Sequence, residues 1–290
     1  MRFRGTRVNP KHFERGQIGF YIVLIPLALV MMLPVVYIIN HAFKPFDELF
    51  AYPPQFFVIR PTLQNFSDMF RFMGQTQTPM SRFLFNSLSS SLIIVIFSVA
   101  LSLQAGYILS KKRFSLKKTL FAINTVSMMF VPIAVRIPRY LVIERAGLLD
   151  TFIILILPML AMPVGLFLVK QFIDQVPDAL IEAARIDGAK EFYIITRVVA
   201  PIVKPALVTV AILAFQTSWN SHEASTLFIN DDNLRTFAFF MHALGTGAGT
   251  EVAAQGMIAA SSLMLFMPNL IIFILMQSQV LNTMAHSGIK

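Results

Sequence analysis

Residues 181–205 read IEAARIDGAKEFYIITRVVAPIVKP, a charged stretch between two strongly apolar segments. Counted with Asp174 and Asp178 just upstream, it contains a third of the acidic residues of this 290-residue chain. Pro177 suits a first helical turn, because its missing N–H would have no partner there in any case. The carboxylate of Asp178 would lie near the positive end of that helix's dipole. The stretch therefore predicts a charged helix outside the apolar parts of the chain.

A turn and a second helix are expected to follow. Gly188 lets the backbone break or turn in conformations that other residues avoid, and a helical pattern resumes after it in residues 189–199. Pro201 and Pro205 would then bend or restart the chain where the next apolar segment begins. We expect two short helices at an angle to one another.

The composition indicates a membrane protein. Hydrophobic residues make up 56% of the chain and charged residues 13%, whereas a typical soluble domain has about 25% charged residues. Cysteine is absent, which excludes disulfides, thiolate metal sites and cysteine nucleophiles. The basic N-terminal segment is followed by an apolar run too long for a signal peptide, so we expect a retained first span.

Six apolar segments are long enough to cross a membrane, which takes about 20 apolar residues in a helix. Residues 236–250 are apolar but short and glycine-rich, which favours a loop or an interfacial helix. The expected fold class is therefore all-α integral membrane, with six transmembrane helices near residues 18–41, 84–109, 118–137, 150–171, 199–218 and 257–281.

The distribution of Lys and Arg predicts that both termini are cytoplasmic. With this orientation, sixteen of the 24 cations lie in inner segments and eight in outer segments. The densest cluster is KKRFSLKK, Lys111–Lys118, with five cations and no acid. Anionic headgroups at the inner leaflet suit such clusters, so the net charge of +9 does not require a nucleic acid partner.

The charged stretch also resembles a known motif. EAARIDGA at 182–189, followed by VVAPIVKPAL at 198–207, is similar to the EAA motif of ABC importer permeases. Ala200 departs from it, since that family more often has leucine before the proline. The chain also resembles the smaller-subunit variety of maltose-type carbohydrate permeases. Four further segments carry this resemblance: NSL (86–88), GYILSKKRF (106–114), VPIAVRIPRYLVIERAGLLDT (131–151) and the tail QVLNTMAHSGIK (279–290).

The resemblance implies the type I ABC importer permease fold. Residues 1–17 would be a cytoplasmic segment, 18–281 the permease domain with a coupling loop at 176–197, and 282–290 a cytoplasmic tail. The coupling helix would dock on a separate ATPase dimer that holds ATP and Mg²⁺, so no catalytic residue, metal or cofactor is expected on this chain. The residues that this places in ATPase coupling are Glu182, Ala183, Ala184, Asp187, Gly188 and Ala189.

The residues alone leave two interpretations of the coupling loop equally open. It could be an amphipathic loop that lies on lipid headgroups. Alternatively, its alternating acids and bases suit a polar, reversible protein interface; they are Glu182, Arg185, Asp187, Lys190 and Glu191.

Two further segments have roles only by resemblance. The tail, with Ser287, Gly288 and Lys290, would lie along the seam between the ATPase subunits; the alternative is a disordered end without a role. The glycine-rich loop 245–256 would reach into the cleft of an extracytoplasmic binding protein; the alternative is a plain flexible loop. Its candidate residues are Thr246, Gly247, Gly249 and Thr250.

Polar residues inside the expected spans are candidates for lining a translocation path, namely Ser91, Asn124, Gln216 and Asn269. Small polar stripes in membrane helices more often mediate helix packing, and a serine stripe of this kind runs along 84–109. We expect Arg136 and Arg139, at the outer end of the third span, to snorkel to headgroups or to form structural pairs rather than to line the path.

The leading interpretation is a non-enzymatic pore subunit of an ATP-driven carbohydrate importer in the inner membrane. An oligosaccharide is the expected solute, with a uronate-containing one as the finer expectation. Partners would be a second permease, an ATPase dimer and the binding protein. A permease for another solute, such as a peptide or phosphate, is the first alternative, and a membrane scaffold is another. A secondary carrier is disfavoured because acids are nearly absent from the spans. A phosphate-binding loop is absent from the sequence, so ATP hydrolysis is not expected on this chain.

Overall fold

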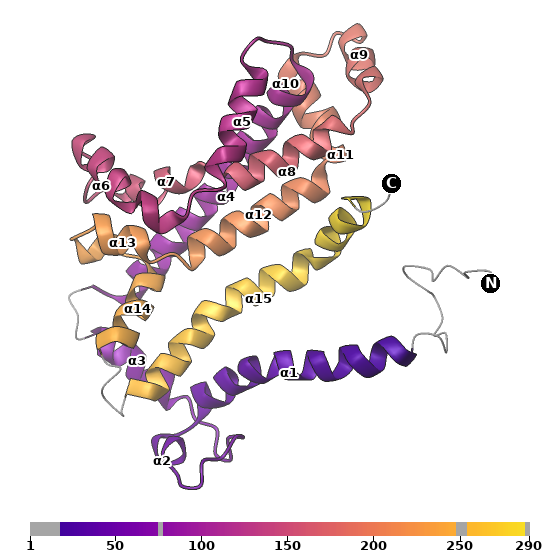
Figure 1. Ribbon diagram of the computed structural model, residues 1–290. Helices are drawn as coiled ribbons and strands as arrows, with labels where there is room; N and C mark the ends of the chain where they lie inside the picture. The colour runs from indigo at the N-terminus through magenta and orange to yellow at the C-terminus, as the bar shows by residue number, and fades with distance from the viewer. Residues whose placement is uncertain (1–17, 75–77, 248–253, 288–290) are drawn as a thin grey trace.

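The computed structural model describes residues 18–74, 78–247 and 254–287, and every regular element within them is a helix. The elements (Figure 1) are α1 (Ile18–Phe43), α2 (Phe46–Leu49), α3 (Gln64–Gly74), α4 (Met80–Lys111), α5 (Lys117–Ser127), η2 (Pro132–Val135), α6 (Arg136–Arg145), η3 (Phe152–Leu155), α7 (Leu157–Leu160), α8 (Pro163–Asp174), α9 (Asp178–Ile186), α10 (Glu191–Tyr193), η4 (Ile194–Val199), α11 (Ala200–Ile202), α12 (Lys204–Trp219), α13 (Glu223–Phe228), η5 (Asp232–Leu234), α14 (Phe237–Gly247) and α15 (Ala254–Ser287).

Three of the described helices, α1, α4 and α15, are each long and apolar enough to cross a membrane. Three bent pairs bring the number of candidate spans to as many as six. The pairs bend by 107° between α5 and η2–α6, by 43° between α7 and α8, and by 88° between α11 and α12. The all-helical fold class is confirmed, and the segments expected near 118–137, 150–171 and 199–218 are broken helices.

Proline accounts for the position of each break. Pro132, Pro163 and Pro205 each lie in the first turn of the element that follows the bend. Proline lacks the N–H that a continuous helix would use and its ring clashes with the preceding turn, but it is well suited to a helix start. Of these three prolines, the sequence predicted a bend only at Pro205.

Two boundaries differ from the sequence-based expectation. The last helix continues to Ser287, six residues beyond its expected end at 281. The segment 236–250 contains a real helix, α14, which fits the interfacial-helix alternative better than the loop. Thus most of the expected C-terminal tail is a continuation of α15.

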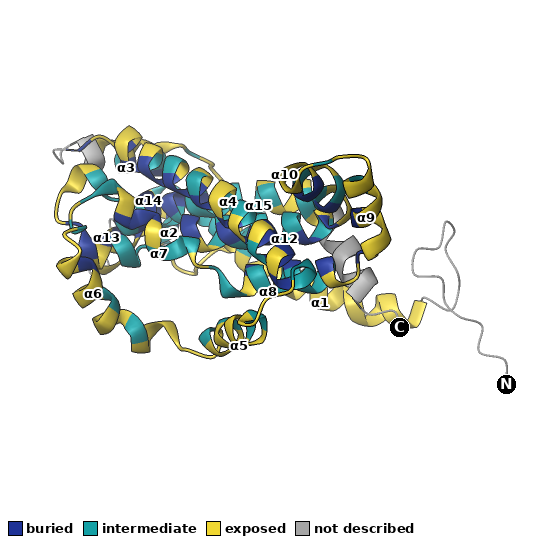
Figure 2. Ribbon diagram, turned by 90° about the horizontal axis from the view of Figure 1, so that it is seen from above, coloured by how far each residue is buried: buried dark blue, intermediate teal, exposed yellow. Residues whose placement is uncertain are grey.

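The core is built around α4, which packs against α8 and α12 (Figure 2). Its serine stripe lies inside this packing. Small residues allow the helices to approach closely: a Cβ added at Gly165 would lie 3.0 Å from Ser102 Oγ, and one at Gly106 would lie 3.2 Å from Val169 Cγ1. The stripe serves helix packing, as its four buried members show: Ser87, Ser91, Ser98 and Ser102.

The molecule has two ends, which both views separate. The charged helix α9, the start of α1 and the end of α15 lie at one end, and α3, α13 and α14 lie at the other (Figures 1 and 2). The long helix α1 packs on α15 and α3, while most of its apolar side chains are exposed. Such exposure suits contact with lipid or with another membrane subunit.

Candidate functional site

The charged stretch folds as two short helical segments joined by a sharp turn. The first is α9, which ends at Ile186, and the second runs from Glu191 to Ile202 before the 88° bend into α12. Between them Gly188 has φ +81°, a left-handed conformation that costs a residue with a Cβ about 1–2 kcal/mol. The two expected helices and the glycine turn are therefore confirmed.

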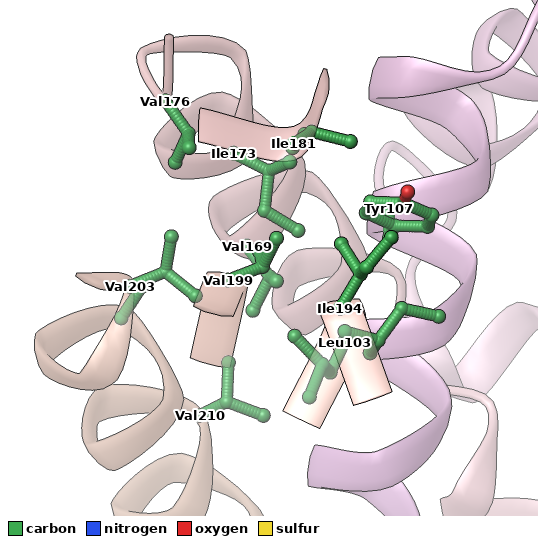
Figure 3. Close-up of a cluster of buried hydrophobic side chains, with 12 residues drawn as sticks. Leu103, Tyr107, Val169, Ile173, Val176, Ile181, Ile194, Val199, Val203 and Val210 are labelled. Atoms are coloured by element: carbon green, nitrogen blue, oxygen red, sulfur yellow. The ribbon is translucent and has the colours of Figure 1, made fainter. Parts of the chain in front are cut away.

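One face of this hairpin is anchored in the protein. Ile181, Ile194 and Val199 are buried in a cluster with side chains from α4, α8 and α12. Figure 3 shows these side chains converging on one another, with the ring of Tyr107 at the edge of the cluster. Apolar packing on one face thus fixes which residues the other face presents.

The opposite face of the hairpin is exposed. Four of the six predicted coupling residues are exposed, namely Glu182, Ala183, Asp187 and Gly188. The other two, Ala184 and Ala189, are half-buried. Ile186 and Phe192 add apolar surface, with 86% and 70% of their area exposed.

The turn also forms a shallow groove of about 540 Å³. Small residues leave room for a side chain of another protein to enter it. The groove is lined by Ala184, Asp187, Gly188, Ala189, Lys190, Tyr193 and Val198.

Glu191, which was grouped with this interface from the sequence, is exposed but is also hydrogen-bonded within the chain. The hydroxyl of Tyr107 donates to Glu191 Oε2 at 2.8 Å, and Lys112 Nζ donates to Glu191 Oε1. Arg185, in the last turn of α9, donates to the same Oε1 at 3.1 Å. The carboxylate therefore links the second segment to both α9 and the end of α4.

The other end of α9 is held in the same way. Lys111 Nζ lies 2.7 Å from Asp178 Oδ1 and donates to the carbonyl of Val176 at 2.6 Å. The pKa of Asp178 is lowered, chiefly by its hydrogen bond from Lys111. Just before this helix, Ser110 Oγ donates to Asp174 Oδ1 at 2.6 Å.

Sequence reasoning missed the role of these cations. It assigned the cluster Lys111–Lys118 only to the membrane orientation rule, whereas two of the cluster's residues, Lys111 and Lys112, bind acids of the charged stretch. The signal was present, because five cations without an acid stand opposite a segment that holds a third of the chain's acids.

The four candidate path residues lie in different surroundings. Ser91 is buried within the chain itself, with 1% of its area exposed, and its Oγ has no hydrogen-bond partner among the described residues. The side chain of Asn124 donates to the carbonyl of Pro163 at 3.1 Å. Asn269 Nδ2 donates to Asn220 Oδ1 at 3.1 Å, and Asn220 Nδ2 donates to the carbonyl of Gln216 at 2.8 Å. Asn269 is thus linked through Asn220, which sequence reasoning did not single out, to the backbone of Gln216.

Asn124 lies apart from this group in a second hollow. An apolar cavity of about 620 Å³ separates α5 from α4 and α8, with Ser102 and Ser127 also in its wall. Few hydrogen-bonding groups face it, so it does not resemble a carbohydrate site.

The remaining candidates stand at the limits of the described chain. Thr246 lies in the last turn of α14, where its Oγ1 donates to the carbonyl of His242 at 3.0 Å, and Gly247 ends that helix. Ser287 is the last residue of α15. Gly249, Thr250, Gly288 and Lys290 lie outside the described residues.

The two outer arginines are paired, as the structural alternative predicted. Arg136 Nε and Arg139 lie 3.2 and 3.6 Å from Glu223 Oε1. Within the described residues, no group of three or more His, Asp or Glu side chains is arranged to hold a metal ion.

Comparison with known proteins identifies the setting of this site. The family described as binding-protein-dependent transport system inner membrane component matches residues 83–280. A relative from Pectobacterium atrosepticum, the sn-glycerol-3-phosphate transport system permease protein UgpE, is 31% identical over 205 residues, which are 70% of this chain and 72% of the relative. The arabinooligosaccharides transport system permease protein AraQ of Bacillus subtilis is 26% identical over 279 residues, 96% of this chain and 97% of the relative.

A solved structure has the same fold. It is the crystal structure of a bacterial ABC transporter involved in the import of the acidic polysaccharide alginate. One of its chains superposes with a TM-score of 0.74 at 19% sequence identity, covering 93% of this chain and 99% of that chain.

Proposed function

The chain belongs to the family of binding-protein-dependent transport system inner membrane components, and from this premise we propose that it is the pore subunit of an ATP-driven importer for an oligosaccharide. It is a multi-pass protein of the inner membrane. In the proposed assembly a second permease completes the pore, a separate ATPase dimer binds ATP and Mg²⁺, and an extracytoplasmic protein delivers the solute. This chain itself binds no cofactor and performs no hydrolysis.

One observation supports the coupling role above the others. The exposed face of α9 and its turn carries the motif residues, while the buried face fixes the helix to three other elements. An exposed face with the apolar side chain of Ile186 and the acids Glu182 and Asp187 suits a cleft on a partner protein better than free water. In our proposal, closure of the ATPase dimer moves this helix and turns the pore outward.

A cross-linking experiment tests the coupling role. The chain contains no cysteine, so Ile186→Cys provides a single thiol on α9. We expect a short bifunctional reagent to join it to the ATPase co-expressed from the same transport system. Tyr52→Cys, whose native side chain is 96% exposed in the loop between α2 and α3, is the matched control and should give no such product. If Ile186→Cys gives no product with an ATPase that co-purifies, the coupling role is wrong.

The solute class rests on the relatives. AraQ is named for arabinooligosaccharides and the solved transporter for alginate, which support an oligosaccharide and, as the finer proposal, one that contains uronates. UgpE, named for sn-glycerol 3-phosphate, favours a phosphate ester as the second candidate. Uptake into proteoliposomes containing the complete transporter separates them, with an oligouronate, a neutral arabinooligosaccharide and sn-glycerol 3-phosphate as competing solutes. Competition by sn-glycerol 3-phosphate alone would replace the oligosaccharide proposal.

Within the pore we retain Asn124, Gln216 and Asn269 as candidate path residues; Asn124 is retained as a polar residue of the path, because the apolar cavity beside it is not itself proposed as a carbohydrate site. We place Ser91 in helix packing, because the chain's own atoms already cover it. Near the outer end, Thr246 and Gly247 lead into the loop proposed to enter the binding protein, together with Gly249 and Thr250. At the other end, α15 leads into the residues proposed to lie at the ATPase seam, which are Ser287, Gly288 and Lys290.

We also propose six spans with both termini in the cytoplasm. Each bent pair then counts as one span. The proposal is supported by the position of α9 at the same end of the molecule as the start of α1 and the end of α15 (Figures 1 and 2).

A further inference from the structure

A cluster of three hydrogen bonds surrounds the carboxylate of Glu191. Its three donors come from two elements or their ends: Tyr107 and Lys112 from the end of α4, and Arg185 from α9. Hydrogen bonds in which one partner is charged are roughly twice as strong as neutral ones. A carboxylate with two oxygens can accept all three donors at once.

This cluster differs from an ordinary surface ion pair because one of its members is rigid. Tyr107 is 1% exposed, and its ring packs among the apolar side chains of the core (Figure 3). An isolated exposed pair contributes little, since two long side chains must be ordered to form it. Here the hydroxyl is already held in place by packing, so the hydrogen bond to Glu191 fixes the position of the carboxylate.

We propose that Glu191 is a positioning residue that fastens α9 to the Lys111 end of α4, so that movement of α9 is passed to α4. The second fastening is the contact of Lys111 with Asp178 and Val176 at the start of α9. Because α9 is held at its first residue and in its last turn, it cannot tilt freely against α4. The proposal rests on the coupling role of α9 and adds one point to it: α9 would not only bind the ATPase but also pass its movement to α4.

Two variants weaken the link without creating a cavity. Tyr107→Phe deletes only the hydroxyl, and Glu191→Gln keeps an acceptor for Tyr107 but loses the charge that binds Lys112 and Arg185. The matched controls are Tyr140→Phe and Glu144→Gln on α6, whose side chains are exposed at the other end of the molecule.

The first measurement needs no partner protein. Spin labels at Ile186→Cys on α9 and Ile108→Cys on α4, both exposed positions, report the distance between the two helices in the full chain in lipid nanodiscs. We expect a broader distance distribution in both link variants and the wild-type width in both controls. Wild-type widths in Tyr107→Phe and Glu191→Gln would overturn the proposal.

The second measurement separates positioning from simple stability. In the assembled transporter, we expect each link variant to lower the ratio of solute-stimulated to basal ATP hydrolysis about threefold, the size of one exposed ion pair, with the ATPase still bound. A broadened distance with an unchanged ratio would also overturn the positioning role. If the wild-type chain itself fails to stimulate the ATPase, the proposed function fails, and the distance measurement still decides whether Glu191 fastens α9.

Discussion

At the scale of single residues, Gly188 determines the shape of the turn between α9 and α10. Its φ of +81° is a backbone conformation that L-residues rarely adopt, while a Cβ added there would meet nothing within 4 Å. Backbone strain, rather than contact with a neighbouring atom, is therefore what a Cβ at this position introduces.

This strain predicts an order of effects for substitutions at Gly188. Asn should be tolerated best, Ala should cost about 1 kcal/mol, and Val should cost more because β-branched residues are least suited to positive φ. Solute-stimulated ATP hydrolysis should fall in the same order while the protein still inserts into the membrane. If Gly188→Val retained full stimulation, the turn geometry would be irrelevant to coupling.

Asp150 holds another turn, at the other end of the molecule. It has φ +57° and accepts hydrogen bonds from the backbone N–H groups of Asn230 and Asp231 at 2.5 and 3.0 Å. These bonds, chiefly that from Asp231, lower the pKa of Asp150. The ionised carboxylate therefore joins the α6–η3 loop to the segment after α13.

The lowered pKa predicts a pH dependence. Because the folded-state pKa lies below the ordinary value, the stabilisation is complete above the ordinary pKa of about 4 and is lost as the pH falls through the folded-state value. Asp150→Asn, which also tolerates positive φ, should lower the melting temperature at pH 7 and narrow its gap from wild type in acid. Glu144→Gln is the control. A gap that stays constant with pH would show that the charge of Asp150 does not hold the turn.

Some of these residue roles could be predicted from the sequence and others could not. The glycine turn and the helix start at Pro177 were predictable, because they depend on local backbone preferences. The role of Glu191 was not, because its partners Tyr107 and Lys112 lie about eighty residues away and their positions depend on the packing of α4 against α8 and α12. Ser91 was likewise ambiguous until its burial within the chain was known.

At the scale of elements, α4 is hydrogen-bonded at both ends. Beyond its contacts with the charged stretch, Asn86 Nδ2 donates to the carbonyls of Asn233 and Arg235 at 2.8 and 3.0 Å. Ser87 Oγ accepts from the N–H of Phe237, the first residue of α14, at 2.8 Å. One helix thus connects α9 to the segment between α13 and α14.

This arrangement predicts that Asn86→Ala loosens the segment between α13 and α14. The carbonyl of Arg235 would lose this donor and that of Asn233 would keep only the bond from Arg82 Nε, at a cost of about 1 kcal/mol. Ser89→Ala is the matched control, since Ser89 bonds only within its own helix. Hydrogen exchange of residues 230–237 should become faster in Asn86→Ala and stay unchanged in Ser89→Ala. Unchanged exchange in both variants would contradict the structural role of Asn86.

The elements themselves were predicted with uneven success. Hydrophobic length located α1, α4 and α15 well, because each is one uninterrupted helix that is long and apolar enough to cross a membrane. It could not predict that the third and fourth segments bend, since Pro132 and Pro163 break a helix only where neighbouring elements or solvent satisfy the freed backbone groups.

At the scale of the whole molecule, the arrangement of the ends predicts the membrane topology. Ser115 is exposed in the turn between α4 and α5, beside the α9 end, and Tyr52 is exposed near α2 at the opposite end. The positive-inside asymmetry places the first position in the cytoplasm and the second outside.

Single cysteines at these positions test that topology in a chain that has no cysteine of its own. In intact spheroplasts, an impermeant maleimide should label Tyr52→Cys and leave Ser115→Cys unmodified until the membrane is permeabilised. The reverse pattern would invert the orientation and place α9 where no cytoplasmic ATPase can reach it. Labelling of both positions in intact cells would require an even number of crossings between them, whereas α4 is the one candidate span among the described residues between the two positions. Either result would therefore contradict the proposed pore subunit as a whole, because docking of α9 and delivery of solute from outside both depend on this orientation.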